Sequence, residues 1–305
     1  MKSARNKTID FSLKDGKEYL DNCIIEKDVL HLPINSTVIG DSFSAMNKLA
    51  DDSIDLLIVD PPYNLDKNFH GNGFKKTNYL EYEKYTRSWI EPLVKKLKKT
   101  ASIYVCCDWE SSLIIGKVLS EYFLLRNRIT WGREKGRGAK ANWKNSMEDI
   151  FFATVSNDFT FNLDAVKQRK KVLAPYKQDG KPKDWVMSKD GKYRYTCPSN
   201  FWDDISVPYW SMSENTSHPT QKPEKLIAKL ILASSNVGDL VFDPFAGSGT
   251  TQVVCKKLGR NYIGVEQNPL YCAWAEKRLD MANTDTAIQG LIDGVFYERN
   301  SIIKK

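Results

Sequence analysis

Short apolar runs alternate with helical patterns in two separate parts of this chain, and that alternation is typical of parallel α/β structure. The expected strands are 37–41, 55–60, 101–107, 148–155, 239–243 and 261–266, and the longer helices are expected over 80–99, 224–235 and 269–280. Because most of these strands are apolar along their whole length, their sheet needs helices on both faces. We therefore expect one large α/β domain, which 305 residues can supply together with an inserted segment.

The segment 156–217 breaks this pattern, being rich in Lys, Asp, Gly, Pro and Ser without a sustained period. A structureless loop of that length is uncommon inside a compact domain, so the segment is predicted to be a small inserted unit or loop system. Between Asp164 and Arg194 it carries ten Lys or Arg against four Asp, with Tyr176, Trp185 and Tyr193 among them and Tyr195 directly after. Such a stretch suits a phosphate backbone and unstacked bases, and a solvated loop explains it equally well.

Composition narrows the classes of protein further. No run approaches the roughly 20 apolar residues of a transmembrane helix, and the basic N-terminus has no apolar signal region, so we expect a cytoplasmic protein. The six cysteines form no CxxC pair and the three histidines are scattered, so no metal site is expected. The formal charge of +7 is by itself only weakly informative.

A glycine turn follows one of the strands, in VFDPFAGSGTT at 241–251. Gly247 and Gly249 would let the backbone approach a ligand closely where a helix begins near Thr250. The next strand ends in Glu266, and an acidic residue at that point commonly holds ribose hydroxyls. The pattern predicts a nucleotide-like cofactor at the carboxyl edge of the sheet, although a tight structural turn would also explain the glycines.

A second motif, LLIVDPPYNL at 56–65, places Asp60 at the end of an apolar strand, before two prolines and an aromatic ring. The Asp60 carboxylate and the Pro61 carbonyl would form a small acceptor cluster beside the face of Tyr63. Two acceptors that hold the hydrogens of an exocyclic amine would localise the nitrogen lone pair, and the amine could then attack a methyl sulfonium in line. A proline-rich turn without chemistry is the alternative.

Taken together, DPPYNL, HPTQKP at 218–223 and DPFAGSGTT resemble, in this order, the β class of exocyclic-amine DNA methyltransferases that use S-adenosylmethionine. The resemblance covers Ile39 to Leu279. It implies a Rossmann-like class I methyltransferase fold, with a mostly parallel seven-stranded sheet, a circularly permuted motif order and an inserted target-recognition region. It also implies a division into an N-terminal extension (1–30), a catalytic half (31–155), a target-recognition region (156–217) and a cofactor-binding half (218–305).

The family's roles can be carried onto matching positions. Asp60, Pro61, Pro62 and Tyr63 would bind and activate the target base. The cofactor is expected to contact Asp41, Thr220, Lys222, Asp243, Phe245, Gly247, Gly249, Thr250 and Glu266. For Lys222 and His218 a helix N-terminal cap is the alternative. Basic residues expected at the DNA are Lys67, Lys75, Lys76, Arg133, Lys135, Arg137, Lys140, Lys167, Arg169, Lys170, Lys171, Lys192 and Arg194.

The target base is expected to be adenine, methylated at N6. Asp60 stands where family members acting on cytosine N4 commonly have Ser, and the chain has no proline–cysteine motif for methylation of a ring carbon. Because Asp also occurs in cytosine-directed members, cytosine N4 stays open, as do an RNA or protein amine and a non-catalytic DNA-binding relative. Double-stranded DNA is the expected partner, with its target base flipped out and a mobile loop at 66–85 closing over it. The resemblance also allows a homodimer and a cognate restriction endonuclease.

Overall fold

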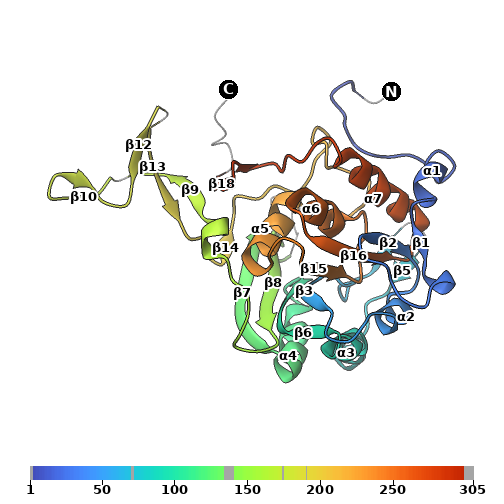
Figure 1. Ribbon diagram of the computed structural model, residues 1–305. Helices are drawn as coiled ribbons and strands as arrows, with labels where there is room; N and C mark the ends of the chain where they lie inside the picture. Colours follow the sequence, from blue (N-terminus) through green and yellow to red (C-terminus); the bar gives the residue numbers. More distant parts are fainter. Residues whose placement is uncertain (1–2, 70–71, 134–140, 174, 190, 299–305) are drawn as a thin grey trace.

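The computed structural model describes residues 3–69, 72–133, 141–173, 175–189 and 191–298, and its centre is one large twisted sheet (Figure 1). Its strands lie in the order β1-β2-β16-β15-β3-β6-β8-β7-β14. Their bounds are β1 Ile24–Ile25, β2 Ser36–Ile39, β3 Ile54–Val59, β6 Leu97–Cys107, β7 Leu124–Gly132, β8 Met147–Thr154, β14 Phe201–Trp202, β15 Leu240–Asp243 and β16 Asn261–Glu266. Strand β8 is antiparallel to both its neighbours, and the other pairings are parallel. Seven strands form the sheet proper, as predicted, and the two-residue strands β1 and β14 extend its edges.

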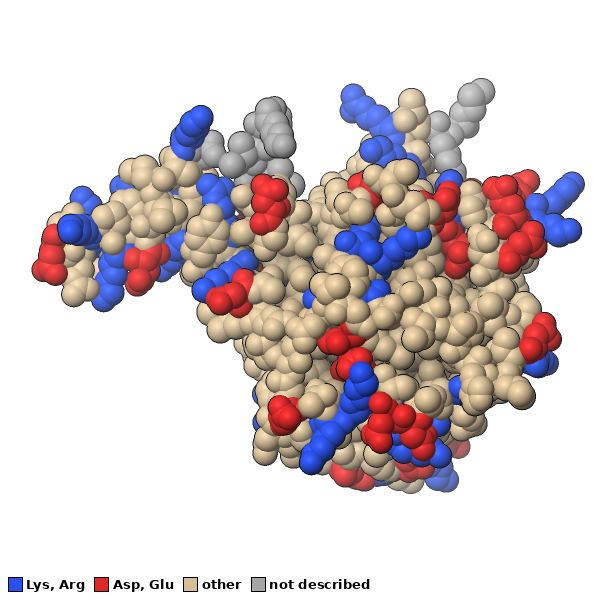
Figure 2. Space-filling view, viewed as in Figure 1, with Lys and Arg blue, Asp and Glu red and all other residues tan. Residues whose placement is uncertain are grey.

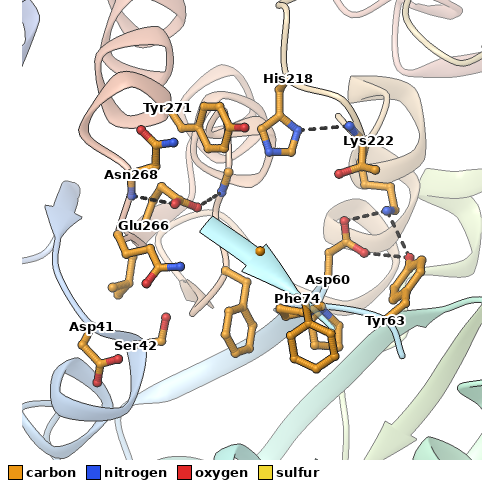
Figure 3. Close-up of a pocket in the computed structure, with 18 of the residues that line it drawn as sticks. Asp41, Ser42, Asp60, Tyr63, Phe74, His218, Lys222, Glu266, Asn268 and Tyr271 are labelled. Carbon is orange, nitrogen blue, oxygen red and sulfur yellow. Dashed lines mark hydrogen bonds and ion pairs between the residues drawn. The ribbon is translucent and has the colours of Figure 1, made fainter. Parts of the chain in front are cut away.

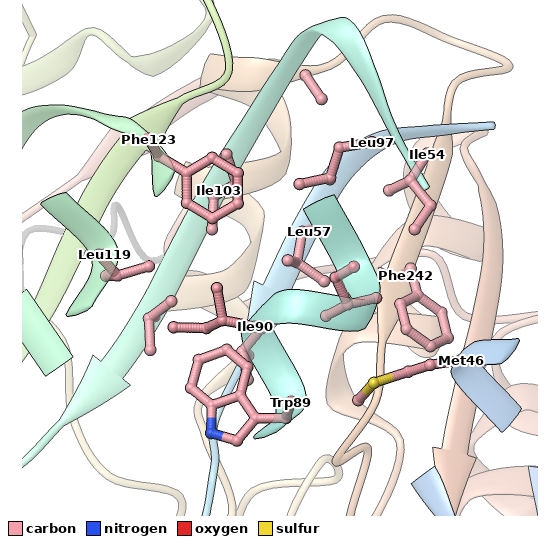
Figure 4. Close-up of a cluster of buried hydrophobic side chains, with 14 of the residues drawn as sticks. Met46, Ile54, Leu57, Trp89, Ile90, Leu97, Ile103, Leu119, Phe123 and Phe242 are labelled. Atoms are coloured by element: carbon pink, nitrogen blue, oxygen red, sulfur yellow. The ribbon is translucent and has the colours of Figure 1, made fainter. Parts of the chain in front are cut away.

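Helices cover both faces of this sheet (Figure 1). The α-helices are α1 Lys17–Leu20, α2 Ser42–Asn47, α3 Tyr79–Val94, α4 Ser112–Tyr122, α5 Glu224–Ser234, α6 Thr250–Leu258 and α7 Pro269–Met281, and the short 3-10 helices are Glu26–Asp28 and Leu163–Val166. Within β3, Leu57 packs in a cluster with residues of α2, α3 and α4, which Figure 4 shows. The adjacent Leu56 faces a second cluster, built with α5 and α6. Successive strand residues point to opposite faces, so an apolar strand serves both cores at once.

The helix expected over 80–99 ends earlier than predicted, at Val94. The cause is tertiary, because the carbonyl of Lys96 accepts hydrogen bonds from the backbone N–H groups of Ser53 (2.9 Å) and Ile54 (3.0 Å). The Lys96 ammonium also donates to the carbonyl of Leu49 at 2.7 Å. These bonds draw the chain into β6, and sheet pairing overrides the helix propensity of the lysines.

The segment 156–217 contributes most of a second, smaller sheet, in the order β12-β13-β9-β18-β17. Its strands are β9 Gln168–Lys171, β12 Val186–Ser188, β13 Gly191–Thr196, β17 Leu291–Ile292 and β18 Val295–Tyr297. In Figure 1 β12 and β13, with the hairpin of β10 (Lys177–Gln178) and β11 (Lys181–Pro182), extend from the central domain as an arm. Phe296 pairs with Gln168, so residues near the C-terminus share a sheet with the insertion. The division at residue 218 stays a prediction, and this hydrogen bonding crosses it.

The segment 66–85, expected to be a mobile loop, contains a β-hairpin and the start of α3. Strands β4 (Lys67–Phe69) and β5 (Asn72–Phe74) pair antiparallel. The ring of Phe74 packs against Tyr82 and Tyr85, with ring centroids 6.5 and 5.4 Å apart. Asn78 begins α3 by accepting a hydrogen bond from the backbone N–H of Glu81, as an N-cap residue does. The expectation that this segment closes over DNA stays a prediction.

Within the described part of the chain, none of the helices is long and apolar enough to cross a lipid bilayer.

Candidate active site

A cavity of about 300 Å³ opens at the carboxyl ends of the parallel strands β2, β3 and β16 (Figure 3). Strands β16, β15 and β3 are neighbours in the sheet, so the residues that end them meet at one edge. Ligands of open α/β sheets bind at this edge. The cavity is lined by all four residues of the DPPY motif, together with Asp41, Thr220, Lys222, Phe245, Gly247 and Glu266 of the predicted cofactor set.

Asp60 lies at the end of β3, where its carboxylate receives two hydrogen bonds. The Tyr63 hydroxyl lies 2.8 Å from one oxygen, and the Lys222 ammonium lies 2.6 Å from the other. Lys222 also donates to the Tyr63 hydroxyl at 3.2 Å, and its side chain is only 7% exposed. Burial and the negative charge of Asp60 raise the pKa of Tyr63 well above its usual value, so Tyr63 keeps its proton.

A second buried carboxylate, that of Glu148 in β8, belongs to the same cluster. Its Oε2 atom lies 3.3 Å from the Lys222 ammonium and 3.3 Å from the Tyr63 hydroxyl. Its other oxygen pairs with the guanidinium of Arg133 at the end of β7. Sequence reasoning did not select Glu148. The available signal was two carboxylates, Glu148 and Asp149, opening an otherwise apolar strand.

The turn that carries the DPPY motif is held from three sides. The Asn64 side chain accepts from the backbone N–H of Thr77 (2.8 Å) and donates to its carbonyl (2.9 Å). The Ser111 hydroxyl accepts the backbone N–H of Asn64 at 3.1 Å, and Tyr82 donates to the carbonyl of Pro62 at 3.1 Å. The acceptor cluster is therefore positioned before any ligand arrives, which is what electrostatic catalysis needs.

On the opposite side of the cavity, Glu266 holds the glycine turn. Its carboxylate accepts backbone N–H bonds from Gly247 (3.0 Å) and Asn268 (2.8 Å), and burial raises its pKa above the usual value. A carboxylate has about four lone-pair sites, so Glu266 keeps acceptor capacity for a ligand hydroxyl. Gly247 and Gly249 have φ of 53° and 73°, which favours glycine. The sequence had identified both positions.

Asp243 and Thr250 lie beneath the turn and bond to protein groups. Asp243 accepts from the Thr251 hydroxyl (2.6 Å) and the backbone N–H of Phe245 (3.0 Å), and burial raises its pKa to about 7. The Thr250 hydroxyl donates to the carbonyl of Lys222 at 3.1 Å and accepts from Arg278 at 3.0 Å. Neither residue is among those that line the cavity. Their predicted contact with a cofactor stays a prediction.

Asp41 and the segment 218–222 complete the cavity. Asp41 caps α2 by accepting the backbone N–H of Ser44 at 2.9 Å. The ring of His218 packs edge-on against Tyr271, with centroids 4.4 Å apart, and its Nδ1 accepts the backbone N–H of Thr220 at 3.3 Å. Pro223 is the N-cap residue of α5, and the Lys222 side chain points to Asp60 and does not cap this helix. Lys222 was predicted to contact the cofactor. In the structure its ammonium contacts Asp60 of the DPPY motif.

Residues 54–277, well over half of the chain, match a family described as DNA methylase. The chain belongs to this family. This match confirms the resemblance to DNA methyltransferases that the three motifs indicated.

Curated relatives agree with this DNA methylase assignment. The chain is 36% identical over 248 residues to "Type II methyltransferase M.HpaI" of Haemophilus parainfluenzae, covering 80% of this chain and 73% of the relative. It is 34% identical over 257 residues to "DNA adenine methyltransferase YhdJ" of Escherichia coli K12, covering 80% and 82%. It is 33% identical to "Type II methyltransferase M1.MboII" of Moraxella bovis over 79% and 94%.

Solved structures confirm the predicted class I methyltransferase fold of this methylase. One is the "PVUII DNA METHYLTRANSFERASE (CYTOSINE-N4-SPECIFIC)", with a TM-score of 0.62 and 20% identity over 89% of this chain and 97% of that one. Another is the "M1.HpyAVI-SAM complex", with a TM-score of 0.52 and 24% identity over 80% and 98%.

The basic residues that the sequence assigned to DNA are spread over the methylase, and several bond to protein groups. Ion pairs join Lys76 to Glu110 (2.7 Å), Lys167 to Asp164 (2.6 Å) and Lys170 to Glu298 (3.5 Å). Arg133 pairs with Glu148, and Lys67 lies in β4. Lys135, Arg137 and Lys140 lie outside the described residues. Contact with DNA stays a prediction for this set.

Arg169 lies inside the small sheet of the methylase. It is 5% exposed, with its guanidinium 3.5 Å from the ring centroid of Tyr193. By contrast Lys75, Lys171 and Arg194 are exposed, and the Lys192 ammonium stacks on Trp185 at 5.2 Å. Figure 2 shows basic side chains along the arm, with acidic ones among them. The exposed members of the set are the ones available to a phosphate backbone.

Proposed function

We propose that this DNA methylase transfers a methyl group from S-adenosylmethionine to N6 of adenine in double-stranded DNA. The observation that carries the proposal is the single cavity in which the Asp60 carboxylate and the glycine turn with Glu266 lie together. The side of the cavity with Asp60 suits an amine that donates hydrogen bonds. The side with Gly247 and Glu266 suits a nucleoside-like ligand.

The residues of the cavity fit this cofactor. Glu266 retains acceptor capacity for a ribose hydroxyl after bonding Gly247 and Asn268. Phe245 supplies an apolar wall, and the Asp41 carboxylate favours a cationic ligand. When bound, S-adenosylmethionine supplies an electrophilic methyl group on a sulfonium. The solved M1.HpyAVI complex bears the name of the same cofactor in its title.

The chain's own residues would act on the amine. Asp60 and the Pro61 carbonyl accept its two hydrogens, and Tyr63 stacks on the ring of the base. The nitrogen would form the new bond to the methyl carbon as the carbon–sulfur bond breaks, which leaves a neutral thioether, and the nitrogen would then release one proton to water. Because this geometry is hidden inside a duplex, the base would be flipped out at a cost of a few kcal/mol.

Adenine is favoured over cytosine by Asp60 and by the relative named as a DNA adenine methyltransferase. The second candidate is cytosine N4, since the similar PvuII enzyme is named as specific for it. Because two relatives are named type II methyltransferases, we also propose a role in a type II modification system, with a cognate endonuclease as its counterpart.

Mass spectrometry of nucleosides from DNA treated with the enzyme and labelled cofactor tests the proposal. Labelled N6-methyladenine is the expected product. Labelled N4-methylcytosine would overturn the choice of adenine, and the absence of any labelled nucleoside would overturn DNA methylation by this chain. Single-molecule sequencing of DNA from cells expressing the chain would then give the sequence context.

A further inference from the structure

Two carboxylates from distant strands share one buried ammonium. The Lys222 Nζ atom lies 2.6 Å from Asp60 Oδ2 and 3.3 Å from Glu148 Oε2. The side chains of Lys222 and Glu148 are 7% and 5% exposed, so water has little access to either. The Tyr63 hydroxyl stands between the same two carboxylates, 2.8 Å from Asp60 and 3.3 Å from Glu148.

This arrangement bears directly on amine binding. Both oxygens of Asp60 already receive a hydrogen bond, one from Tyr63 and one from the ammonium of Lys222. A charge-assisted bond of 2.6 Å is roughly twice as strong as a neutral one, so it competes with an incoming amine for the same oxygen. Asp60 becomes the better acceptor if Lys222 transfers its bond elsewhere.

Glu148 is placed to receive that bond. A buried ammonium that loses its partner suffers a large desolvation penalty, and little solvent reaches Lys222 to replace Asp60. Glu148 already lies within ion-pair distance of Lys222, and it is held from its far side by Arg133. The cluster holds two carboxylates and two cationic side chains. Its net charge is therefore zero whether Lys222 pairs with Asp60 or with Glu148.

We propose that Glu148 is a positioning residue that takes over the Lys222 ammonium when the target amine enters, and thereby frees Asp60 to accept the amine. The inference rests on the proposed function. It adds a role for β8, a strand that none of the three sequence motifs includes.

The test is a double-mutant cycle on single-turnover methylation at saturating cofactor and DNA. Glu148→Gln keeps the size of the side chain and one acceptor oxygen but removes its charge, so Lys222 stays on Asp60. We expect a fall in rate on the order of 10²-fold, with the dissociation constant of the cofactor unchanged. In a Lys222→Met background the same substitution should change the rate less than about threefold, because Glu148 acts through Lys222.

Equal losses in the two backgrounds would overturn the proposal, as would a Glu148→Gln enzyme as fast as the wild type. Asp149→Asn is the matched control. It removes the neighbouring carboxylate of the same strand, which is buried and bonded to Thr130 at 2.7 Å on the other face. This control should retain the single-turnover rate, and a loss equal to that of Glu148→Gln would point to damage of the strand and overturn the proposal.

If Glu148→Gln does not fold, Glu148→Asp replaces it in the same cycle, because it keeps the charge but withdraws the carboxylate by one methylene. The same criterion then applies. The wild-type reaction separates the two levels of inference. A wild-type enzyme that methylates no DNA refutes the proposed function, whereas an active wild type with independent Glu148 and Lys222 refutes only the positioning role.

Discussion

The Lys222 ammonium lies 2.6 Å from the Asp60 carboxylate, although the two residues are 162 positions apart in the chain. The contact joins the motif DPPY to the motif HPTQKP at the carboxyl end of β3. In the structure, Asp60 is therefore one member of an ion pair.

Asp60→Ala tests the catalytic assignment. Removing the carboxylate should lower methyl transfer by at least about 10²–10³-fold, as loss of one preorganised electrostatic group does. Cofactor affinity, measured by calorimetry, should be unchanged, because Lys222 keeps Glu148 as a partner and stays in place. An activity within tenfold of the wild type would refute the role of Asp60.

Glu266→Gln tests the cofactor side. The amide keeps an oxygen that can accept from Gly247 or Asn268, but it loses the charge. We expect binding of S-adenosylmethionine to weaken by about 1.5–3 kcal/mol, the range for hydrogen bonds to charged groups. Calorimetry gives the dissociation constant, and an unchanged value would contradict the assignment.

Gly249→Ala should destabilise the fold more than Gly238→Ala. Both glycines have positive φ (73° and 86°), so each alanine is strained by roughly 1–2 kcal/mol. At Gly249 a Cβ would also lie 2.5 Å from the Cβ of Ala275, whereas at Gly238 it would meet nothing within 4 Å. Overpacking adds about 1–3 kcal/mol at Gly249 alone. Urea denaturation of both variants measures the difference, and equal losses would rule out the close packing of the turn against α7.

Glu214 should make stability depend on pH in an unusual direction. Burial, and the negative charge of Glu224, raise its pKa from 4.5 to about 7. The folded state therefore holds a proton that the unfolded state releases between about pH 4.5 and pH 7. This contribution to stability is fully present below pH 4.5 and is lost as the pH rises through 7.

Glu214→Gln, which is neutral at every pH, removes that dependence. Its Oε1 can still accept the backbone N–H of Glu224, a bond of 2.7 Å in the wild type. Relative to the wild type, the variant should gain on the order of 1–3 kcal/mol of unfolding free energy between pH 4.5 and pH 7. Urea titrations at both pH values measure this gain, and parallel pH profiles of the two proteins would contradict it.

Asp204→Ala should be among the most destabilising changes in the insertion. Asp204 pairs with Lys225 (2.6 Å) and Lys229 (3.2 Å) of α5, and burial lowers the pKa of Lys229 to about 8. Removing the carboxylate takes away the negative partner of two buried ammonium groups. We expect this to lower the free energy of unfolding by about 3–5 kcal/mol. The exposed neighbour provides the control, since Asp203→Ala should stay within about 0.5 kcal/mol. Equal effects in urea denaturation would refute the buried pairing.

Much of the sheet could be predicted because its strands are apolar on both faces, and the cofactor turn because Gly247 and Gly249 mark positive φ. The end of α3 could not be predicted, because the bonds that stop the helix come from Ser53 and Ile54 in another part of the chain. Local propensity carries no information about such partners.

The same limit applies to the site. Asp60 and Glu266 could be located from their positions at strand ends. Glu148 is marked in the sequence only as one of two carboxylates that begin an apolar strand, and its place beside Lys222 depends on the antiparallel pairing of β8 with β7 and β6. The burial of Arg169 against Tyr193 was also hidden, since a basic run looks alike whether its side chains stack on a ring or face solvent.

The pairing of β18 with β9 has a consequence for exchanging the insertion 156–217 between relatives. Phe296 lies in register with Gln168, and its backbone N–H donates to the carbonyl of Lys167 at 3.4 Å. Lys225 donates to the carbonyl of Tyr297 at 2.7 Å. A chimaera that receives only 156–217 from a donor would pair foreign strands with a native one. A transplant of this module therefore needs two pieces of chain, the insertion and the stretch 291–297, taken from the same parent.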